Sequence, residues 1–212
     1  MLDIDAKLSP EFEKAVECLV RTHEAVDKYT ACHGSFVGVL VEVLATTMGA
    51  SNQGARTLNY ASRLHDIGKI SLEQNLLHAP RALSIEERNQ VKGHSLEGAN
   101  ILKPNNTPFF DLAADIAATH HEYADGSGYP YGLSGEQISL AAKIVTFCDV
   151  YEALRARRSY KEGMSHSKVV TILTKGDDRV STKMFDIRVL QAFVKIEKFF
   201  EEMYDDMTHT HH

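Results

Sequence analysis

Tryptophan is absent from this 212-residue chain, and proline (5), glycine (13) and cysteine (3) are all scarce. The low proline and glycine content excludes a collagen-like chain and disfavours a disordered one. The three cysteines are odd in number and form no CxxC pair, so neither a disulfide framework nor a thiolate zinc site is expected. The N-terminus lacks a basic start followed by an apolar stretch. These absences predict a cytoplasmic protein.

Positive charge is also in short supply, with 23 Lys and Arg against 29 Asp and Glu, a net charge of −6. Extended nucleic acid and anionic membranes are bound by basic surfaces, so neither is predicted as a partner. The most apolar stretch, residues 34–50, is slightly short for a membrane span and contains Glu42. A buried helix is expected there instead, with no membrane insertion.

Histidine, in contrast, is abundant, with eleven residues. The chain ends in THTHH, which resembles part of a purification tag. Because a terminal histidine cluster binds metals adventitiously, His209, His211 and His212 are set aside, and residues 206–212 are predicted to be a tail. The other histidines lie inside the chain and require a different explanation.

The spacing of apolar residues follows a helical period nearly throughout, and no convincing alternating run predicts a strand. Ser84 followed three residues later by Glu87 is typical of a helix N-terminus. The predicted helices cover about 10–29, 33–48, 52–65, 84–102, 108–120, 139–155, a segment from 165, and 182–205. Since there is no repeat, low-complexity stretch or long linker, the sequence predicts an all-α, single-domain helical bundle.

One segment contains too many glycine and proline residues to be helical. It reads DGSGYP, from Asp125 to Pro130. Glycine and proline at these positions predict a tight, ordered loop between two helices.

Polar residues occur on helix faces that are otherwise apolar, namely His33, His94, His120 and Asp149. A single such histidine is more often a hydrogen-bonded core residue than a ligand. A buried, unpaired aspartate is harder to explain in that way, because its desolvation costs several kcal/mol. Several imidazoles and carboxylates on inward faces therefore indicate one shared cation site. Iron, manganese, zinc and nickel all suit these ligands, and the residues alone do not choose among them.

Four strings occur in a characteristic order: HDIGK, KGHSLEGANIL, HHEYADGSGYPYGLSGEQISLAAKIV and DVYEALRARRSYK. Together they resemble the HD-GYP family of cyclic dinucleotide phosphodiesterases, from about His33 to Phe193. The resemblance implies a helical bundle of the HD superfamily type with an ordered GYP loop. Residues 31–205 are then expected to form the catalytic domain, and residues 1–30 a lead helix packed on it.

The resemblance also implies two divalent metal ions, with iron or manganese favoured over nickel or zinc. The implied ligands of one ion are His33, His65, Asp66 and Asp149. The implied ligands of the other are His94, His120 and His121, with Asp66 bridging both ions. A bridging hydroxide would attack the phosphodiester phosphorus.

Further roles follow from the resemblance alone. His65, Asp66 and Lys69 are expected to be catalytic. Lys69 and Arg158 match positions near the scissile phosphate, although Lys69 could be a helix C-terminal cation and Arg158 part of a solvated basic face. The residues expected to shape the substrate pocket are Gly126, Gly128, Tyr129 and Pro130, with the tyrosine ring offering a stacking surface.

Several positions depart from the family pattern. Some relatives carry a glutamate for a third metal where this chain has Tyr29, so a two-metal site is expected. Arg157 and Ser159 replace the usual Asp and Pro, and ISLEQNLLHAPRAL after HDIGK is also atypical. These departures question substrate preference more than activity.

The function expected from the sequence is hydrolysis of cyclic di-GMP to pGpG or GMP. Three alternatives are weighed: the same chemistry on 3′,3′-cyclic GMP-AMP, a non-catalytic cyclic dinucleotide receptor, and a generic HD-type phosphohydrolase of mononucleotides. Intact ligand positions disfavour the receptor, and DGSGYP disfavours the generic hydrolase. Signalling protein partners and a homodimer are compatible with the sequence.

Overall fold

The computed structural model describes residues 8–25, 32–79, 81–105, 107–156 and 163–210. Within these ranges every regular element is helical, which confirms the all-α prediction. Among the same residues, no helix combines the length and the apolar character needed to cross a bilayer.

Local capping signals explain where several helices begin. The first helices are α1 (Pro10–Glu24), α2 (His33–Thr47) and α3 (Asn52–Ser62). The hydroxyl of Ser9 accepts a hydrogen bond from the backbone of α1, and Ser51 does the same for α3. Later helices α7 (Pro108–Thr119) and α8 (Leu140–Arg155) are capped in this way by Thr107 and Ser139. These starts agree with the sequence predictions.

Besides α1 and α3, which end earlier than predicted, two predicted helices differ from the structure. The helix expected from Ser84 to about Leu102 is divided into α5 (Ile85–Lys92) and α6 (His94–Leu102) at Gly93. The predicted capping box of Ser84 and Glu87 is present. The last helix, α10 (Ile187–Thr210), begins later than expected, because residues 182–184 form a separate 3-10 turn, η4.

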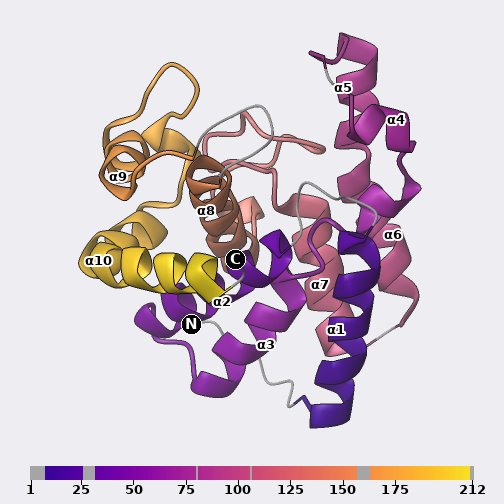
Figure 1. The fold of residues 1–212 in the computed structure, drawn as a ribbon, viewed down its shortest axis with the longest axis horizontal. Coiled ribbons are helices and arrows are strands. Elements are labelled where there is room, and N and C mark those ends of the chain that lie inside the picture. Colours follow the sequence, from indigo (N-terminus) through magenta and orange to yellow (C-terminus); the bar gives the residue numbers. More distant parts are fainter. Residues whose placement is uncertain (1–7, 26–31, 80, 106, 157–162, 211–212) are drawn as a thin grey trace.

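The remaining elements connect these helices. They are η1 (Ile67–Ser71), α4 (Gln74–Leu77), η2 (Lys103–Asn105), η3 (Gly135–Gln137) and α9 (His166–Lys175). As expected, the DGSGYP segment lies in an irregular connection between α7 and α8. Figure 1 shows α4 and α5 at one end of the molecule, opposite α9 and α10.

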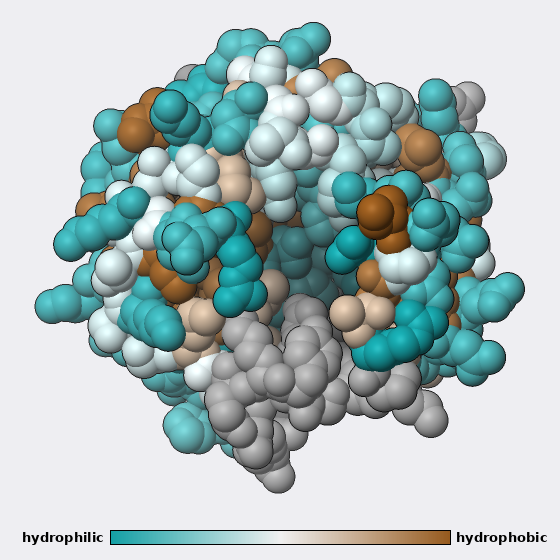
Figure 2. Space-filling model, turned by 90° about the horizontal axis from the view of Figure 1, so that it is seen from above, coloured by the Kyte–Doolittle hydropathy of each residue, from teal (hydrophilic) through white to brown (hydrophobic). Residues whose placement is uncertain are grey.

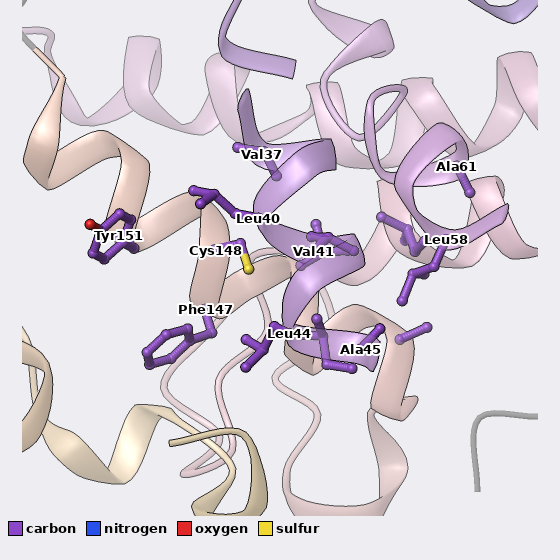
Figure 3. Packing of buried hydrophobic residues seen from close by; sticks show 14 of the residues in the cluster. Val37, Leu40, Val41, Leu44, Ala45, Leu58, Ala61, Phe147, Cys148 and Tyr151 are labelled. Carbon is purple, nitrogen blue, oxygen red and sulfur yellow. The ribbon is translucent and has the colours of Figure 1, made fainter. Parts of the chain in front are cut away.

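The core is built around α2, which packs against α3, α8 and α10. Its residues Val37, Leu40 and Leu44 are fully buried, and Figure 3 shows them beside Leu58 of α3 and Phe147 of α8. Burial of apolar surface contributes about 25 cal/mol per Å². The same core therefore fixes α2 and α8, which carry His33 and Asp149, and α3, which precedes His65 and Asp66.

Candidate metal centre

The predicted ligands converge in two neighbouring groups. The first cluster consists of His33, His65 and Asp149, and the second consists of Asp66, His94, His120 and His121. Within each cluster, one ligand atom from every member lies within 4.8 Å of the others. The clusters draw on α2, α6, α8 and the segments that follow α3 and α7. Residues far apart in the chain thus meet in one place.

Asp66 stands between the two clusters. Its Oδ2 atom lies 3.4 Å from Nε2 of His65 and 3.9 Å from Nε2 of His33. Its Oδ1 atom lies 3.2 Å from Nε2 of His94 and 3.8 Å from Nε2 of His120. One carboxylate oxygen therefore faces each cluster, as a bridging ligand requires.

Each of four histidines is oriented by a hydrogen bond from its outer ring nitrogen. The Nδ1 partners are Glu152 Oε2 for His33 (2.6 Å), Ser62 O for His65 (2.7 Å), Val91 O for His94 (2.7 Å) and Ala117 O for His120 (3.0 Å). Because these oxygens accept, the proton of a neutral ring belongs on Nδ1. Nε2 then presents a lone pair to the cluster.

This orientation brings inner lone pairs together. Nε2 of His33 lies 3.2 Å from Nε2 of His65, and Nε2 of His94 lies 3.3 Å from Nε2 of His120. Facing acceptors repel unless a proton or a cation lies among them. Imidazole nitrogens and carboxylate oxygens held by outer hydrogen bonds fit divalent transition metals. The residues present therefore suit two such ions.

The electrostatics differ between the clusters. Burial alone would lower the pKa of His33, but Glu152 and Asp149 raise it to about 10. In the second cluster, burial and neighbouring histidines lower the pKa of His120 well below its usual range, and burial lowers that of His121 to about 4. Carboxylates thus dominate the surroundings of His33 in the first cluster, whereas burial dominates those of His120 and His121 in the second.

A close backbone crossing brings Asp66 beside His94. Gly68 in η1 packs against the first turn of α6, where a Cβ atom would lie 2.0 Å from the carbonyl oxygen of His94 and 2.4 Å from the amide nitrogen of Gly98. Only glycine allows this approach. The glycine of HDIGK therefore permits the segment that carries Asp66 to lie against the helix that carries His94.

Lys69 contacts the carboxylate of Asp66 directly, with Nζ 2.6 Å from Oδ2. Burial by itself would raise the pKa of Asp66, but Lys69 and His65 hold it well below its usual range. The carboxylate is therefore ionised. This contact places Lys69 at the centre, rather than only at a helix end.

The GYP loop, the connection between α7 and α8 that contains DGSGYP (residues 125–130), lies against the second cluster. The ring of Tyr129 lies against His121, with ring centroids 4.6 Å apart, and its backbone N–H donates to the carbonyl of His121. Burial and Asp66 raise the pKa of Tyr129, so its phenol is neutral. Gly128 packs on the loop's own backbone, where a Cβ atom would lie 2.4 Å from the His121 carbonyl oxygen. Gly126 has a φ of +81°, and Pro130 follows a cis peptide bond.

A buried carboxylate fastens this loop. Glu122, only 1% exposed, accepts hydrogen bonds from the backbone N–H groups of Tyr131 (2.6 Å) and Leu133 (2.9 Å). Its neighbours His120 and His121 are both members of the second cluster. Glu122 thus couples the loop to two of the candidate ligands.

Three residues that support the site were not predicted from the sequence: Gly68, Glu122 and Glu152. Glu152 follows Asp149 by three residues on one helix, a spacing that could have indicated a shared face. Glu122 directly follows the two histidines of HHE, but nothing local reveals that it points to the loop. Of the predicted substrate contacts, Arg158 lies outside the described residues, as does Tyr29.

One face of the molecule is hollowed. Figure 2 views the molecule from above the orientation of Figure 1, the side on which α5 lies. The surface there is hollowed near its centre, and the visible depth of the hollow is polar.

The HD domain family model matches residues 14–182. A cyclic di-GMP phosphodiesterase of Thermotoga maritima is 36% identical over 191 residues, covering 90% of this chain and 51% of that protein. A 3′3′-cGAMP-specific phosphodiesterase of Vibrio cholerae is 36% identical over 151 residues, covering 71% of this chain and 29% of that protein. The chain therefore spans about half, or less, of these relatives.

Solved structures share the fold. An HDG"Y"P protein from Bdellovibrio bacteriovorus has a TM-score of 0.61 at 22% identity, covering 89% of this chain and 63% of its own. The HD domain of the L. monocytogenes phosphodiesterase PgpH, in complex with cyclic-di-AMP, has a TM-score of 0.59 at 18% identity, covering 91% and 97%. At these sequence identities, the structural similarity shows that the chains share a fold and shows nothing about their function.

Proposed function

The chain belongs to the HD domain family, in its HD-GYP branch, and from this premise we propose that it is a metal-dependent phosphodiesterase of cyclic dinucleotides. The observation that carries the proposal is the position of Asp66, with one carboxylate oxygen facing each histidine cluster. A site for two adjacent divalent ions is typical of phosphoryl-transfer enzymes.

The proposed ligands are His33, His65 and Asp149 for one ion and His94, His120 and His121 for the other, with Asp66 shared. Two divalent ions there would lower the pKa of a water molecule and neutralise phosphoryl oxygens. In the reaction, a water oxygen forms a new bond to phosphorus and the P–O3′ bond breaks. The 3′ oxygen gains a proton, which gives a linear dinucleotide.

The protein's own residues would prepare this reaction. Glu152 and the backbone carbonyls hold four imidazoles in place before substrate arrives. Lys69 lies beside Asp66, where its ammonium can meet a phosphoryl oxygen or the departing 3′ oxygen. Tyr129 closes one side of the second cluster and keeps a neutral phenol there.

Cyclic di-GMP is the proposed substrate, because the relative aligned over 90% of this chain is a cyclic di-GMP phosphodiesterase. The 3′,3′-cyclic GMP-AMP molecule is the second candidate, since a relative of equal identity is specific for it. A receptor without activity is disfavoured because all seven candidate ligands are present and converge.

The test starts from anaerobically purified protein without its last four residues, reloaded with manganese or iron. Cyclic di-GMP, 3′,3′-cyclic GMP-AMP and ATP are supplied separately, and products are resolved by chromatography. We expect a linear dinucleotide from a cyclic dinucleotide, and none from the H65A/D66A double variant. Tight binding without turnover with manganese, iron and nickel would identify a receptor instead. Elemental analysis that finds a reproducible third metal equivalent would contradict the two-ion site.

A further inference from the structure

A lysine outside both clusters lies next to the GYP loop. Lys92 is the last residue of α5 and precedes the cluster residue His94 by two positions. It is exposed, and its Nζ atom lies over the ring of Tyr129, 4.9 Å from the centroid. In the part of the chain that the structure describes, no carboxylate lies within ion-pair distance of it.

Ring contacts connect this lysine to the candidate metal centre. The Tyr129 ring contacts Lys92 and also lies 4.6 Å from the ring of His121, centroid to centroid. The separation between Lys92 Nζ and the centroid of the His121 ring therefore cannot exceed the sum of these two distances. A substrate phosphate at the clusters would have Lys92 on one side.

Several other cations of the domain contact carboxylates. Lys69 contacts Asp66, Lys143 is buried against Asp186, and Arg155 pairs with Asp205. A cyclic dinucleotide carries two phosphodiesters on one ring, and only one of them can occupy the reacting position. The second remains charged, a ring's width away, and requires a cation at the rim.

We propose that Lys92 binds the second, non-reacting phosphate of the cyclic dinucleotide and thereby favours substrates with two phosphates over simple phosphodiesters. This inference rests on the proposed function. In binding, the ammonium leaves the face of Tyr129, or tilts from it, and donates to a phosphate oxygen.

A purely structural role for Lys92 is the alternative, since a cation at the end of α5 interacts favourably with the helix dipole. That role would affect stability and would not distinguish between substrates. The two roles of Lys92 are therefore distinguished by whether the effect of its substitution depends on the substrate.

The experiment compares wild type with K92M, which removes the charge but keeps an unbranched side chain, and with K92R, which restores a cation. K195M serves as the matched control, because Lys195 is an exposed lysine on α10, opposite α5 in Figure 1. Steady-state rates are measured on cyclic di-GMP and on bis(p-nitrophenyl) phosphate, which has a single phosphate. Calorimetry gives the affinity for cyclic di-GMP independently of turnover.

For K92M we expect KM and Kd for cyclic di-GMP to rise about tenfold, the effect of one charge-assisted hydrogen bond, with kcat within about twofold of wild type. Rates on the single-phosphate substrate should not change, and K92R should recover most of the affinity. Unchanged KM and Kd in K92M would overturn the inference, as would an equal loss on both substrates. Absence of hydrolysis of every substrate by wild type would instead refute the proposed function, while the calorimetry still tests Lys92.

Discussion

The buried carboxylate of Glu122 offers a sharp test of how the GYP loop is held. It is 1% exposed and accepts two short backbone hydrogen bonds, 2.6 Å from Tyr131 and 2.9 Å from Leu133. In a Glu122→Gln variant, the amide oxygen can accept one of these bonds, but its NH₂ group faces the other N–H. A donor then opposes a donor in a buried position.

The magnitude follows from these contacts. A hydrogen bond to a charged group contributes about 1.5–3 kcal/mol, and a buried donor left without an acceptor costs about 1–3 kcal/mol. One bond is lost outright and the other loses its charge assistance. We therefore expect the E122Q variant to lose roughly 2–4 kcal/mol in the free energy of unfolding, or to release the loop locally by a similar amount.

Urea denaturation followed by circular dichroism measures the global loss, and amide hydrogen exchange at Tyr131 and Leu133 measures the local release. Phosphodiesterase activity should fall, because Tyr129 is no longer held against His121. Bound metal should remain, since both carboxylate oxygens of Glu122 face the loop rather than the clusters.

An exposed residue provides the control. Glu202 lies on α10, and E202Q changes the same functional group without a buried contact. If E122Q matched E202Q in stability, in exchange at the two amides and in activity, the assignment of Glu122 as the anchor of the loop would be refuted.

Three further predictions concern groups around the centre. Gly68→Ala should destabilise the protein by roughly 3 kcal/mol or more, because the added Cβ meets α6 backbone at 2.0 Å; an unchanged melting temperature would contradict this. Glu152→Gln should weaken metal binding at the first cluster 10–100-fold in chelator competition, and unaltered affinity would remove its positioning role. Arg188 and Lys143 hold the pKa of Asp186 well below its usual range. This pairing stabilises the fold above about pH 4 and is lost as the pH falls towards the folded-state pKa. Asp186→Asn should therefore cost roughly 2–4 kcal/mol at pH 7 and flatten the dependence of unfolding free energy on pH between 5 and 2; parallel curves would exclude the pairing.

Local signals in the sequence were sufficient for most of the fold. Ser9, Ser51, Thr107 and Ser139 cap the helices as their residue types predict, because a hydroxyl at this position meets a free backbone N–H within three residues. The division at Gly93 was missed, since the apolar period continues across it. The late start of α10 was missed for the same reason.

The candidate ligands could be named from the sequence because they fall at inward positions in a recognisable order. The resemblance also implied their division between two ions and the bridging position of Asp66, but the distances between them could not be predicted. His33 and Glu152 are 119 residues apart, and the 2.6 Å between them depends on how α2 packs on α8. The same holds for Lys92, whose approach to Tyr129 depends on where α5 meets the GYP loop.

By itself, the sequence determined the helical class, the loop between α7 and α8 and the identities of seven candidate ligands, because capping, periodicity and motif order act over short stretches of chain. Only the tertiary structure decided the distances at which the two oxygens of Asp66 face the two clusters, that Glu122 fastens the loop and that Lys92 lies at its edge. These are distances between segments far apart in sequence, and the packing of the shared core sets them.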